Sequence, residues 1–295
     1  MDTSHGEGSV TGGAEDPALQ ARLDDLDTRL RDLGSVVVAF SGGVDSAFLL
    51  AAAERALGSS RVTAATAISP SLPATELEGA RAFARRLGVP HLTPQTDEMS
   101  REGYRANSGD RCYFCKAELL EVLRPLVREL GTSHIATGTN ADDAAAGFRP
   151  GIRAAAERGA LTPLLDAGLT KQQVRLASRQ WELSTWDKPA AACLSSRVAY
   201  GIQVSPYRLA RVERAEADLR QALRSADIPV TNLRVRDLGE RARIEVDEPV
   251  VERVNSCVPA LESVRAAGFP EVEVDPRGFR SGAMNEMLAD PERYR

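Results

Sequence analysis

Three consecutive patterns between residues 35 and 57 constrain the fold more than any other part of the chain. SVVVAF (35–40) is a short β-branched run typical of a buried strand, SGGVDS (41–46) contains two adjacent glycines, and DSAFLLAAAERAL (45–57) has the alanine and leucine content of a helix. A strand that passes through a tight turn directly into a helix is the first half of a βαβ unit. The following residues, to about 140, repeat this alternation.

The repeated alternation predicts an α/β fold, with a Rossmann-like parallel sheet that carries helices on both faces. A leucine-periodic helix at 18–33 precedes the first strand and ends at Gly34, a typical C-cap. The remaining runs are predicted as a strand at 61–68, a helix at 74–87, a weak strand at 91–96, a helix at 116–130 and a strand at 133–139.

From about residue 200 the pattern changes to that of a smaller α+β domain. A long charged helix begins after Ser205, a favourable N-cap, with Pro206 in its first turn. Two alternating runs, NLRVRDLGE and RARIEVD, predict a β-hairpin, and a helical stretch and a last strand, EVEVDPRGF, follow. We therefore divide the chain into a Gly-rich leader expected to be disordered at 1–16, an α/β domain at 17–200 and a C-terminal α+β domain at 201–295.

Composition excludes several classes of protein. The chain has 295 residues, of which 43% are hydrophobic, an ordinary globular content. A formal net charge of −5 and only 5% aromatic residues do not favour a nucleic-acid partner. No stretch reaches the roughly 18 apolar residues of a membrane helix, and the N-terminus lacks the regions of a signal peptide. We expect a cytoplasmic protein whose cysteines are reduced unless they bind metal or take part in chemistry.

SGGVDS has the chemistry of an anion-binding loop. Small residues and unpaired backbone N–H groups at the start of a helix form a cradle for phosphate, and Gly42 and Gly43 allow the backbone to approach it closely. The loop lacks the Gly-Lys-Ser/Thr of a Walker A motif. The Asp45 carboxylate would be repelled by phosphate unless it caps the helix or reaches Mg²⁺. A plain strand-to-helix turn, with Asp45 as an N-cap, is the alternative interpretation.

Cysteines occur in two contexts that indicate chemistry. RCYFCK places Cys112 and Cys115 in a CxxC, which is compatible with a redox dithiol, half of a zinc site or part of an iron–sulfur site. Cys193 lies among small residues in DKPAAACLSSR, where flanking cations, Arg197 among them, favour a nucleophilic thiolate. A buried structural cysteine is the alternative there. Cys257 is predicted to be a packed core thiol.

The SGGVDS loop after an apolar strand resembles that of the PP-loop ATP pyrophosphatases, which cleave ATP between its α- and β-phosphates and adenylate a substrate. Five motifs, taken together and in order, are similar to those of the LarE-type ATP-dependent sulfur transferases. They are SGGVDS, RCYFCK, DKPAAACLSSR, LRVRDLGERARIEV and GFRSGAMNE. The similarity runs from about residue 20 to about residue 290. Members of that family act in the biosynthesis of the nickel-pincer nucleotide cofactor, so the resemblance implies a sulfurtransferase that forms AMP and pyrophosphate.

The resemblance also implies a substrate and a source of sulfur. ATP, with Mg²⁺, adenylates a carboxylate of pyridinium-3,5-dicarboxylate mononucleotide, and a sulfur nucleophile displaces AMP to leave a thiocarboxylate. In one mode of the family, a 4Fe–4S cluster held by Cys112, Cys115 and Cys193 carries sulfide. In the other mode, Cys193 gives up its own sulfur in a single turnover. The CxxC favours the cluster mode, and in both modes Cys193 and Asp45 are the expected catalytic residues.

Binding residues follow from the resemblance as well. Arg234 and Arg236 alternate along a strand, so both face one side, where two guanidinium groups suit the phosphate of the mononucleotide. The alternative is an exposed strand face balanced by neighbouring acidic residues. Arg197 and Glu245 complete the expected substrate-binding set. The expected ATP-binding residues are Ser41, Gly42, Gly43, Val44, Asp45, Ser46, Thr66, Ile68, Ser69, Gly138, Thr139 and Asn140.

Three other functions share some of these features. A tRNA thiolase with the same loop and three cysteines would need a basic RNA-binding face, which the net charge does not favour. An amide-forming synthetase would not need the cysteines, and an ATP-sensing module would release no pyrophosphate. By resemblance we expect a small-molecule nucleotide as the partner and a homo-oligomer, often a hexamer, with the C-terminal domain serving substrate binding and assembly.

Overall fold

The computed structural model describes residues 16–287 except residues 133, 146–148, 190–191 and 281. Of the leader expected at 1–16, residues 1–15 lie outside the described residues. Asp16 belongs to the folded chain, because it precedes helix α1 (Pro17–Leu33) and its carboxylate accepts a hydrogen bond from the Ala18 N–H at 3.0 Å. Asp16 is therefore the N-cap of α1, and a proline follows at the first helical position.

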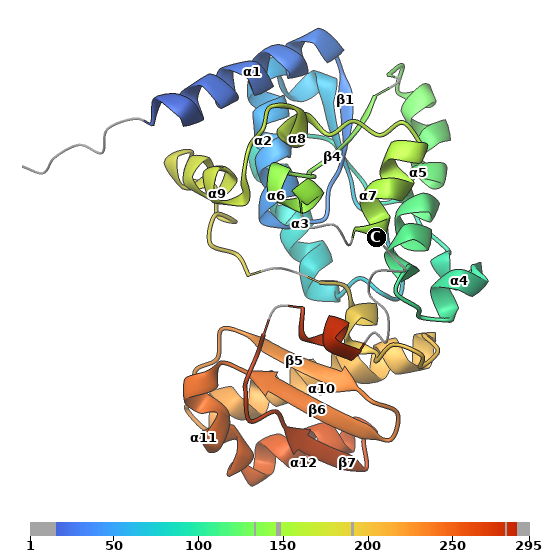
Figure 1. Ribbon diagram of the computed structural model, residues 1–295, viewed down its shortest axis with the longest axis vertical. Helices are drawn as coiled ribbons and strands as arrows, with labels where there is room; N and C mark the ends of the chain where they lie inside the picture. Colours follow the sequence, from blue (N-terminus) through green and yellow to red (C-terminus); the bar gives the residue numbers. More distant parts are fainter. Residues whose placement is uncertain (1–15, 133, 146–148, 190–191, 281, 288–295) are drawn as a thin grey trace, which may run out of the picture.

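The first half of the chain forms an α/β layer. Four parallel strands lie in the order β3-β2-β1-β4, and helices flank the sheet (Figure 1). The prediction of a parallel sheet flanked by helices is confirmed. The predicted strand at 91–96 is shorter, because it is interrupted before Pro94 and pairs again only at Gln95. The strands are β1 (Val36–Ala39), β2 (Val62–Ala65), β3 (His91–Leu92) and β4 (Ile135–Thr137).

Helices cover both faces of this sheet (Figure 1). Helix α1 packs against α2, and α2 packs against α9, whereas α5 packs against α7. The helices of this half are α1, α2 (Val44–Leu57), α3 (Ala74–Leu87), α4 (Glu102–Arg105), α5 (Arg111–Glu129), α6 (Ala141–Ala145), α7 (Pro150–Glu157), α8 (Pro163–Asp166) and α9 (Lys171–Gln180).

Strand β1 is buried on both faces, which explains its uninterrupted run of apolar residues. Val36 and Val38 pack into one core with residues of α1, α2 and α3. Val37 and Ala39 pack into a separate cluster with residues of α5. Successive side chains of a strand point to opposite faces, so a central strand covered by helices on both sides has no polar face.

The order of the strands places a topological switch point beside β1. The chain leaves β1 toward β2 on one side and later returns to β4 on the other side. In open parallel sheets, ligands bind beyond the carboxyl ends of the strands at such a point, because the connecting segments diverge there. The SGGVDS loop follows β1 and residues 138–140 follow β4, so both lie at this position.

Helix α5 begins at Arg111, whereas we expected this helix to span 116–130. Cys112 and Cys115 therefore lie on the first turns of α5. Cysteine, tyrosine and phenylalanine have weak helix propensity, which hides this start in the sequence. Contacts of Arg111 with distant residues, described below, fix it instead.

The second half of the chain forms a smaller sheet at the other end of the molecule (Figure 1). Strands β5 (Leu233–Asp237) and β6 (Arg241–Val246) are antiparallel, as the hairpin pattern predicts, and β7 (Glu271–Val274) pairs with β6 in parallel. Helices α10 (Pro206–Ser225) and α12 (Val258–Ala266) pack against each other, and α11 (Val251–Asn255) contacts β7. No helix among the described residues is long and apolar enough to cross a membrane.

The core of this second layer also takes residues from earlier in the chain. Tyr104, Leu194 and Val198 are buried in it, and the Ala199 N–H donates to the Asp237 carbonyl of β5 at 2.9 Å. The segment that follows Cys193 is thus attached to the second layer, before the boundary that we place at residue 200. Cys257 is partly buried and packs against the same core.

Candidate active site

The SGGVDS loop closes on itself through its serine hydroxyl groups. Gly42 has a φ of +71°, a conformation that favours glycine, and Gly43 is the N-cap of α2, whose first residue, Val44, is buried. The Ser46 hydroxyl donates to the Gly43 carbonyl at 3.1 Å and accepts from the Ser41 N–H at 3.2 Å. The loop is therefore preformed at the N-terminus of a long helix, where the backbone dipoles favour an anion.

A cavity opens beside this loop at the switch point, and we term it the phosphate cavity. Thr137, Lys116 and Asp143 contribute to its wall. The expected ATP-binding residues that line it are Ser41, Gly43, Asp45, Ser46, Gly138 and Thr139.

The Asp45 carboxylate is held by partners from distant parts of the chain. The Lys171 ammonium donates to Oδ2, and the Asn140 amide donates to Oδ1 at 3.2 Å. Lys171 is the first residue of α9, which begins with a capping box between Thr170 and Gln173. A cation beside Asp45 offsets the repulsion between this carboxylate and a bound polyphosphate. Lys171 is absent from the residues expected from sequence, because no local motif connects it with the loop.

The residues after β4 hold the loop from the other side. A Cβ added to Gly138 would lie 2.7 Å from the backbone nitrogen of Ser46, so only glycine allows β4 to approach α2 this closely. Asn140 is buried, and its Oδ1 accepts the N–H groups of Asp142 and Asp143 at 3.0 and 3.1 Å. Asn140 thus connects the start of α6 with Asp45.

A second cavity, here termed the cysteine cavity, joins the loop to the cysteines. Thr66 and Ser69 line it near the end of β2, together with Ser41, Cys115 and Cys193. The Thr66 hydroxyl donates to a backbone carbonyl at the end of β1, at 2.7 Å. Ile68, another expected ATP-binding residue, is half-buried and is not in the lining of this cavity; its N–H donates to the Pro94 carbonyl at 2.8 Å. The cysteine cavity therefore brings expected ATP-binding residues and two cysteines to one place.

Lys116 lines both cavities. It follows Cys115 on α5, and its ammonium makes no hydrogen bond or ion pair with the part of the chain that the structure describes. Burial lowers the pKa of Lys116, and the Cys115 and Cys112 thiols, when ionised, oppose this shift. Lys116 is thus a cation placed between the phosphate cavity and the sulfur atoms, a role that sequence reasoning did not assign to it.

A buried carboxylate also faces the cysteine cavity. Glu98 accepts hydrogen bonds from the Ser71 hydroxyl at 2.9 Å, from the Thr96 hydroxyl at 3.0 Å and from the Ser69 hydroxyl. The Ser71 carbonyl in turn accepts the Leu194 N–H at 2.8 Å. This network attaches the segment beside Cys193 to the end of β2, and no sequence pattern marked Glu98.

The three expected cluster ligands are linked by electrostatic effects, because the charge of Cys193 acts on both Cys112 and Cys115. Cys112 is exposed, and Cys115 and Cys193 are partly buried. The surrounding protein raises the pKa of the Cys112 and Cys115 thiols, and the charge of Cys193 raises both further. Three cysteines without a histidine form a donor set that suits a 4Fe–4S cluster with one open iron. Among the described residues, however, no three His, Cys, Asp or Glu side chains are gathered to hold a metal, so the thiols fit in type and must move together to bind a cluster.

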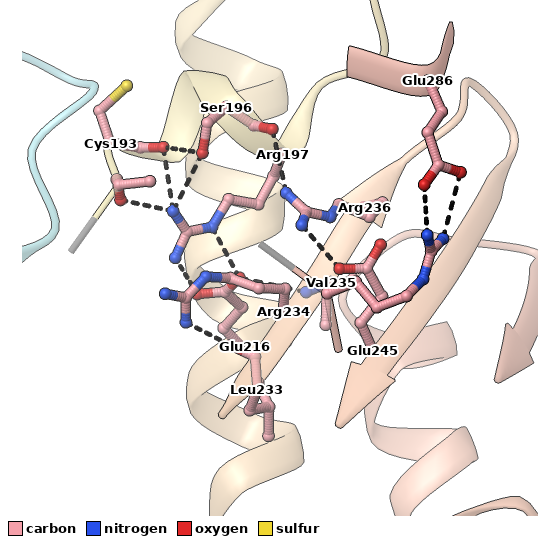
Figure 2. Close-up of polar contacts among 12 residues, drawn as sticks. Cys193, Ser196, Arg197, Glu216, Leu233, Arg234, Val235, Arg236, Glu245 and Glu286 are labelled. Carbon is pink, nitrogen blue, oxygen red and sulfur yellow. Dashed lines mark hydrogen bonds and ion pairs between the residues drawn. The ribbon is translucent and has the colours of Figure 1, made fainter. Parts of the chain in front are cut away.

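Arg197 stabilises the backbone beside Cys193 instead of presenting a cation to the cavity. Its guanidinium donates to the Cys193 carbonyl at 3.0 Å and pairs with Glu216 at 2.9 Å (Figure 2). Figure 2 shows the Cys193 sulfur pointing away from this guanidinium. Lys188, the other flanking cation, donates to the Gly42 carbonyl at 2.9 Å. These contacts do not support a direct contact of Arg197 with substrate.

A third cavity lies beside the second sheet and is termed the guanidinium cavity. Arg111, Arg234 and Arg236 line it, together with the rings of Tyr200 and Phe279. Burial lowers the pKa of Arg234 to about 10, and the charges of nearby arginines, including Arg236, add to the effect. Several guanidinium groups around one cavity favour an anionic ligand.

Arg236 is partly neutralised by the protein. One of its Nη atoms donates to Glu245 at 2.6 Å and the other to the Ser196 carbonyl at 3.1 Å (Figure 2). Both side chains of this ion pair are buried. The structure thus places Glu245 behind Arg236 as its counter-ion, where it fixes the direction of the guanidinium group.

Comparisons with known proteins match a family model and several relatives. A family model described as NAD synthase matches residues 20–111, which include the phosphate loop. The chain is 40% identical over 273 residues to an uncharacterized protein of Synechocystis sp., covering 92% of this chain and 99% of that protein. It is 24% identical over 249 residues to an uncharacterized protein of Methanocaldococcus jannaschii, covering 83% and 91%.

One relative has a name that states its chemistry. The chain is 34% identical over 266 residues to the pyridinium-3,5-bisthiocarboxylic acid mononucleotide synthase of Lactiplantibacillus plantarum, and the alignment covers 88% of this chain and 92% of that enzyme. The phosphate loop at the switch point and the neighbouring cysteines are consistent with such chemistry. The chain therefore belongs to the LarE-type ATP-dependent sulfur transferases of the PP-loop superfamily.

Proposed function

We propose that the chain uses ATP to activate a carboxylate of pyridinium-3,5-dicarboxylate mononucleotide and converts it into a thiocarboxylate. One observation supports this proposal most strongly: Lys116 lines both the phosphate cavity and the cysteine cavity, so the ATP site and the sulfur-bearing residues are adjacent. The name of the L. plantarum relative supports the substrate class. An adjacent nucleophile suits an adenylating enzyme, because water would otherwise hydrolyse the activated intermediate.

In the first proposed step, a carboxylate oxygen attacks the α-phosphorus of ATP. The bond from this phosphorus to the bridging oxygen breaks, and pyrophosphate leaves with the electron pair. The N–H groups and serine hydroxyls of the loop bind the pyrophosphate portion. Asp45 and Asp143, which also line the phosphate cavity, are the proposed ligands of the Mg²⁺ that accompanies ATP.

In the second proposed step, a sulfur nucleophile attacks the acyl carbon. The bond between this carbon and the AMP oxygen breaks, and AMP leaves with the electron pair, so the product is a thiocarboxylate. In the cluster mode, sulfide held beside Cys193 at the cysteine cavity would be this nucleophile; in the alternative mode it is Sγ of Cys193, whose Cβ–Sγ bond must then break to release the thiocarboxylate. Lys116 stabilises the negative charge on the departing AMP, because it lies between this cavity and the phosphate cavity.

Cys112, Cys115 and Cys193 are the proposed ligands of a 4Fe–4S cluster. When bound, the cluster would supply sulfide repeatedly from its one iron without a protein ligand. The charge of Cys193 raises the pKa of both the Cys112 and the Cys115 thiol, which supports a shared role of these residues. In the alternative mode, the Cβ–Sγ bond of Cys193 breaks, dehydroalanine remains and each chain reacts once.

Two expectations about partners stay predictions. A homo-oligomer, often a hexamer in this family, is tested by light scattering of the purified chain. The absence of a tRNA partner is tested by binding at low salt, where electrostatic attraction to RNA is strongest. Stable retention of tRNA there would favour a tRNA thiolase over the proposed function.

The experiment that tests the proposed function measures pyrophosphate and thiocarboxylate together, without oxygen. With ATP, Mg²⁺, sulfide and the mononucleotide, the wild type should release pyrophosphate only when the mononucleotide is present. Cys193→Ala should release pyrophosphate but form no thiocarboxylate. Cys257→Ala is the matched control and should behave as the wild type, because Cys257 packs in the second layer. Pyrophosphate release at the same rate with and without the mononucleotide would contradict the proposal, and so would thiocarboxylate formation by Cys193→Ala.

A further inference from the structure

Four arginines are buried among the described residues, and one of them differs from the others. Three of them each form an ion pair with a carboxylate: Arg197 with Glu216 at 2.9 Å, Arg211 with Asp237 at 2.6 Å, and Arg236 with Glu245 at 2.6 Å. Arg111 is only 5% exposed, yet it forms no ion pair with an acidic residue in the described parts of the chain. A buried charge without a counter-ion is costly, so this exception requires an explanation.

The hydrogen bonds of Arg111 do not supply the missing charge. One Nη donates to the Ser195 carbonyl at 2.7 Å and to the amide oxygen of Asn107. Both acceptors are neutral. The guanidinium also lies 5.8 Å from the ring centre of Tyr200, a weaker electrostatic contact.

Arg111 also lies at the start of the CxxC. Cys112 is adjacent to it in the chain, on the first turn of α5. Arg111 is therefore next to the sulfur-bearing residues.

Arg111 also lines the guanidinium cavity, which Arg234 and Arg236 line from β5. It comes from the start of α5, the helix that carries the CxxC. The cavity thus has one guanidinium on the side of the cysteines and two on the side of the second sheet. An anion that enters the cavity would meet Arg111 on the side of the cysteines and two further guanidinium groups on the side of β5.

We propose that Arg111 binds the carboxylate of the substrate that is to be converted, while Arg234 and Arg236 bind its phosphate. This inference rests on the proposed function and deepens it by orienting the substrate. A planar guanidinium matches a planar carboxylate through two parallel hydrogen bonds, which an ammonium cannot form. Binding at Arg111 holds the carboxylate at the cysteine side of the cavity and the phosphate at the β5 side.

The test uses two ligands that differ only at this group: pyridinium-3-carboxylate mononucleotide and its 3-carboxamide. Affinities are measured by titration calorimetry with the wild type, Arg111→Gln, Arg111→Lys and Arg128→Gln. Arg128 is an exposed residue of the same helix and serves as the matched control. ATP binding, which uses a separate cavity, reports whether each variant is folded.

The wild type should bind the carboxylate ligand at least about tenfold more tightly than the carboxamide, as expected for a charge-assisted pair. Arg111→Gln should lose this preference and bind the carboxamide within about twofold of the wild type. Arg111→Lys should keep part of the preference, and Arg128→Gln should keep all of it. If Arg111→Gln does not bind ATP, the preference for the carboxylate ligand is measured with Arg111→Lys instead. The lysine keeps a cation that can still donate a hydrogen bond to the Ser195 carbonyl.

The outcomes separate the inference from the proposed function. If Arg111 variants weaken both ligands equally, Arg111 only holds the segment around Ser195 and the inference is wrong. An unchanged preference in Arg111→Gln also overturns it. If the wild type binds neither ligand, the proposed function itself fails.

Discussion

Gly138→Ala tests whether the contact between the end of β4 and the start of α2 shapes the ATP site. The new Cβ would lie 2.7 Å from the Ser46 nitrogen, 2.9 Å from the Asp45 carbonyl carbon and 3.0 Å from the Ser46 Cα. All three neighbours are backbone atoms, so no side chain can rotate away, and either β4 or the loop must shift. Overpacking of a tight site costs about 1–3 kcal/mol, and the rigid neighbours place this substitution at about 3 kcal/mol.

The effect on ATP should exceed the effect expected from stability alone. A shift of α2 displaces the N–H groups that bind phosphate, and a misplacement of about 1 Å can cost about 100-fold in rate. We therefore expect Gly138→Ala to lower kcat/KM for ATP at least about tenfold in the pyrophosphate assay. Chemical unfolding measures the stability change independently.

Gly79→Ala is the control for this prediction. Gly79 is an exposed residue within α3, and a Cβ added there meets no atom within 4 Å. Alanine is a better helix former than glycine by about 1 kcal/mol, so this variant should be as stable as the wild type or more stable. If Gly138→Ala unfolds at the wild-type denaturant concentration and keeps the wild-type kcat/KM, the close approach is not what shapes the loop.

Three further predictions concern charged residues. Lys171→Ala should raise the KM for ATP about tenfold, because a charge-assisted contact near the phosphates is lost. The free energy of unfolding should change by less than about 1 kcal/mol, because the ion pair with Asp45 is partly exposed. A KM unchanged in the pyrophosphate assay would contradict the role of Lys171. Glu245→Gln should lower the free energy of unfolding by about 3 kcal/mol in a denaturant titration, because Arg236 then stays buried without its counter-ion. An unchanged denaturant concentration at the midpoint of unfolding would refute this reasoning. Burial lowers the pKa of Lys116, so Lys116 loses its positive charge at a lower pH than an exposed lysine does. The value of kcat/KM should fall as the pH rises through this lowered pKa, and Lys116→Arg should move the fall to higher pH. A pH profile of Lys116→Arg identical to that of the wild type would exclude Lys116 as the origin of the fall.

The parts of the site that could be predicted from sequence are those that a few neighbouring residues determine. The SGGVDS loop lies between a strand and a helix, and these local patterns suffice to place it at the switch point. Alternation along β5 likewise predicts that Arg234 and Arg236 share a face, and both line the guanidinium cavity. Such features depend on spacing within a short segment.

The parts that could not be predicted depend on contacts between distant segments. Lys171 reaches Asp45 across 126 residues of sequence, and Arg111 reaches the Ser195 carbonyl across 84. The helix start at Arg111 was missed for the same reason, because the side chain that fixes it binds far along the chain. Arg197 shows a related limit: Glu216 and nearby carbonyls bind its guanidinium group, which the sequence does not indicate, and its contact with substrate stays a prediction. Charge in a sequence does not tell which groups in the fold will neutralise it.

The most direct test of the central claim counts thiocarboxylates formed per chain. The claim is that one site, built from the phosphate loop and three cysteines, activates the carboxylate and transfers sulfur repeatedly. After anaerobic reconstitution with iron and sulfide, the wild type should contain iron and form several thiocarboxylates per chain with excess ATP, mononucleotide and sulfide. Cys112→Ala should lose the visible chromophore and form at most one per chain. A wild type without iron that stops after one turnover, with the mass of H₂S lost from Cys193, would contradict the cluster mode.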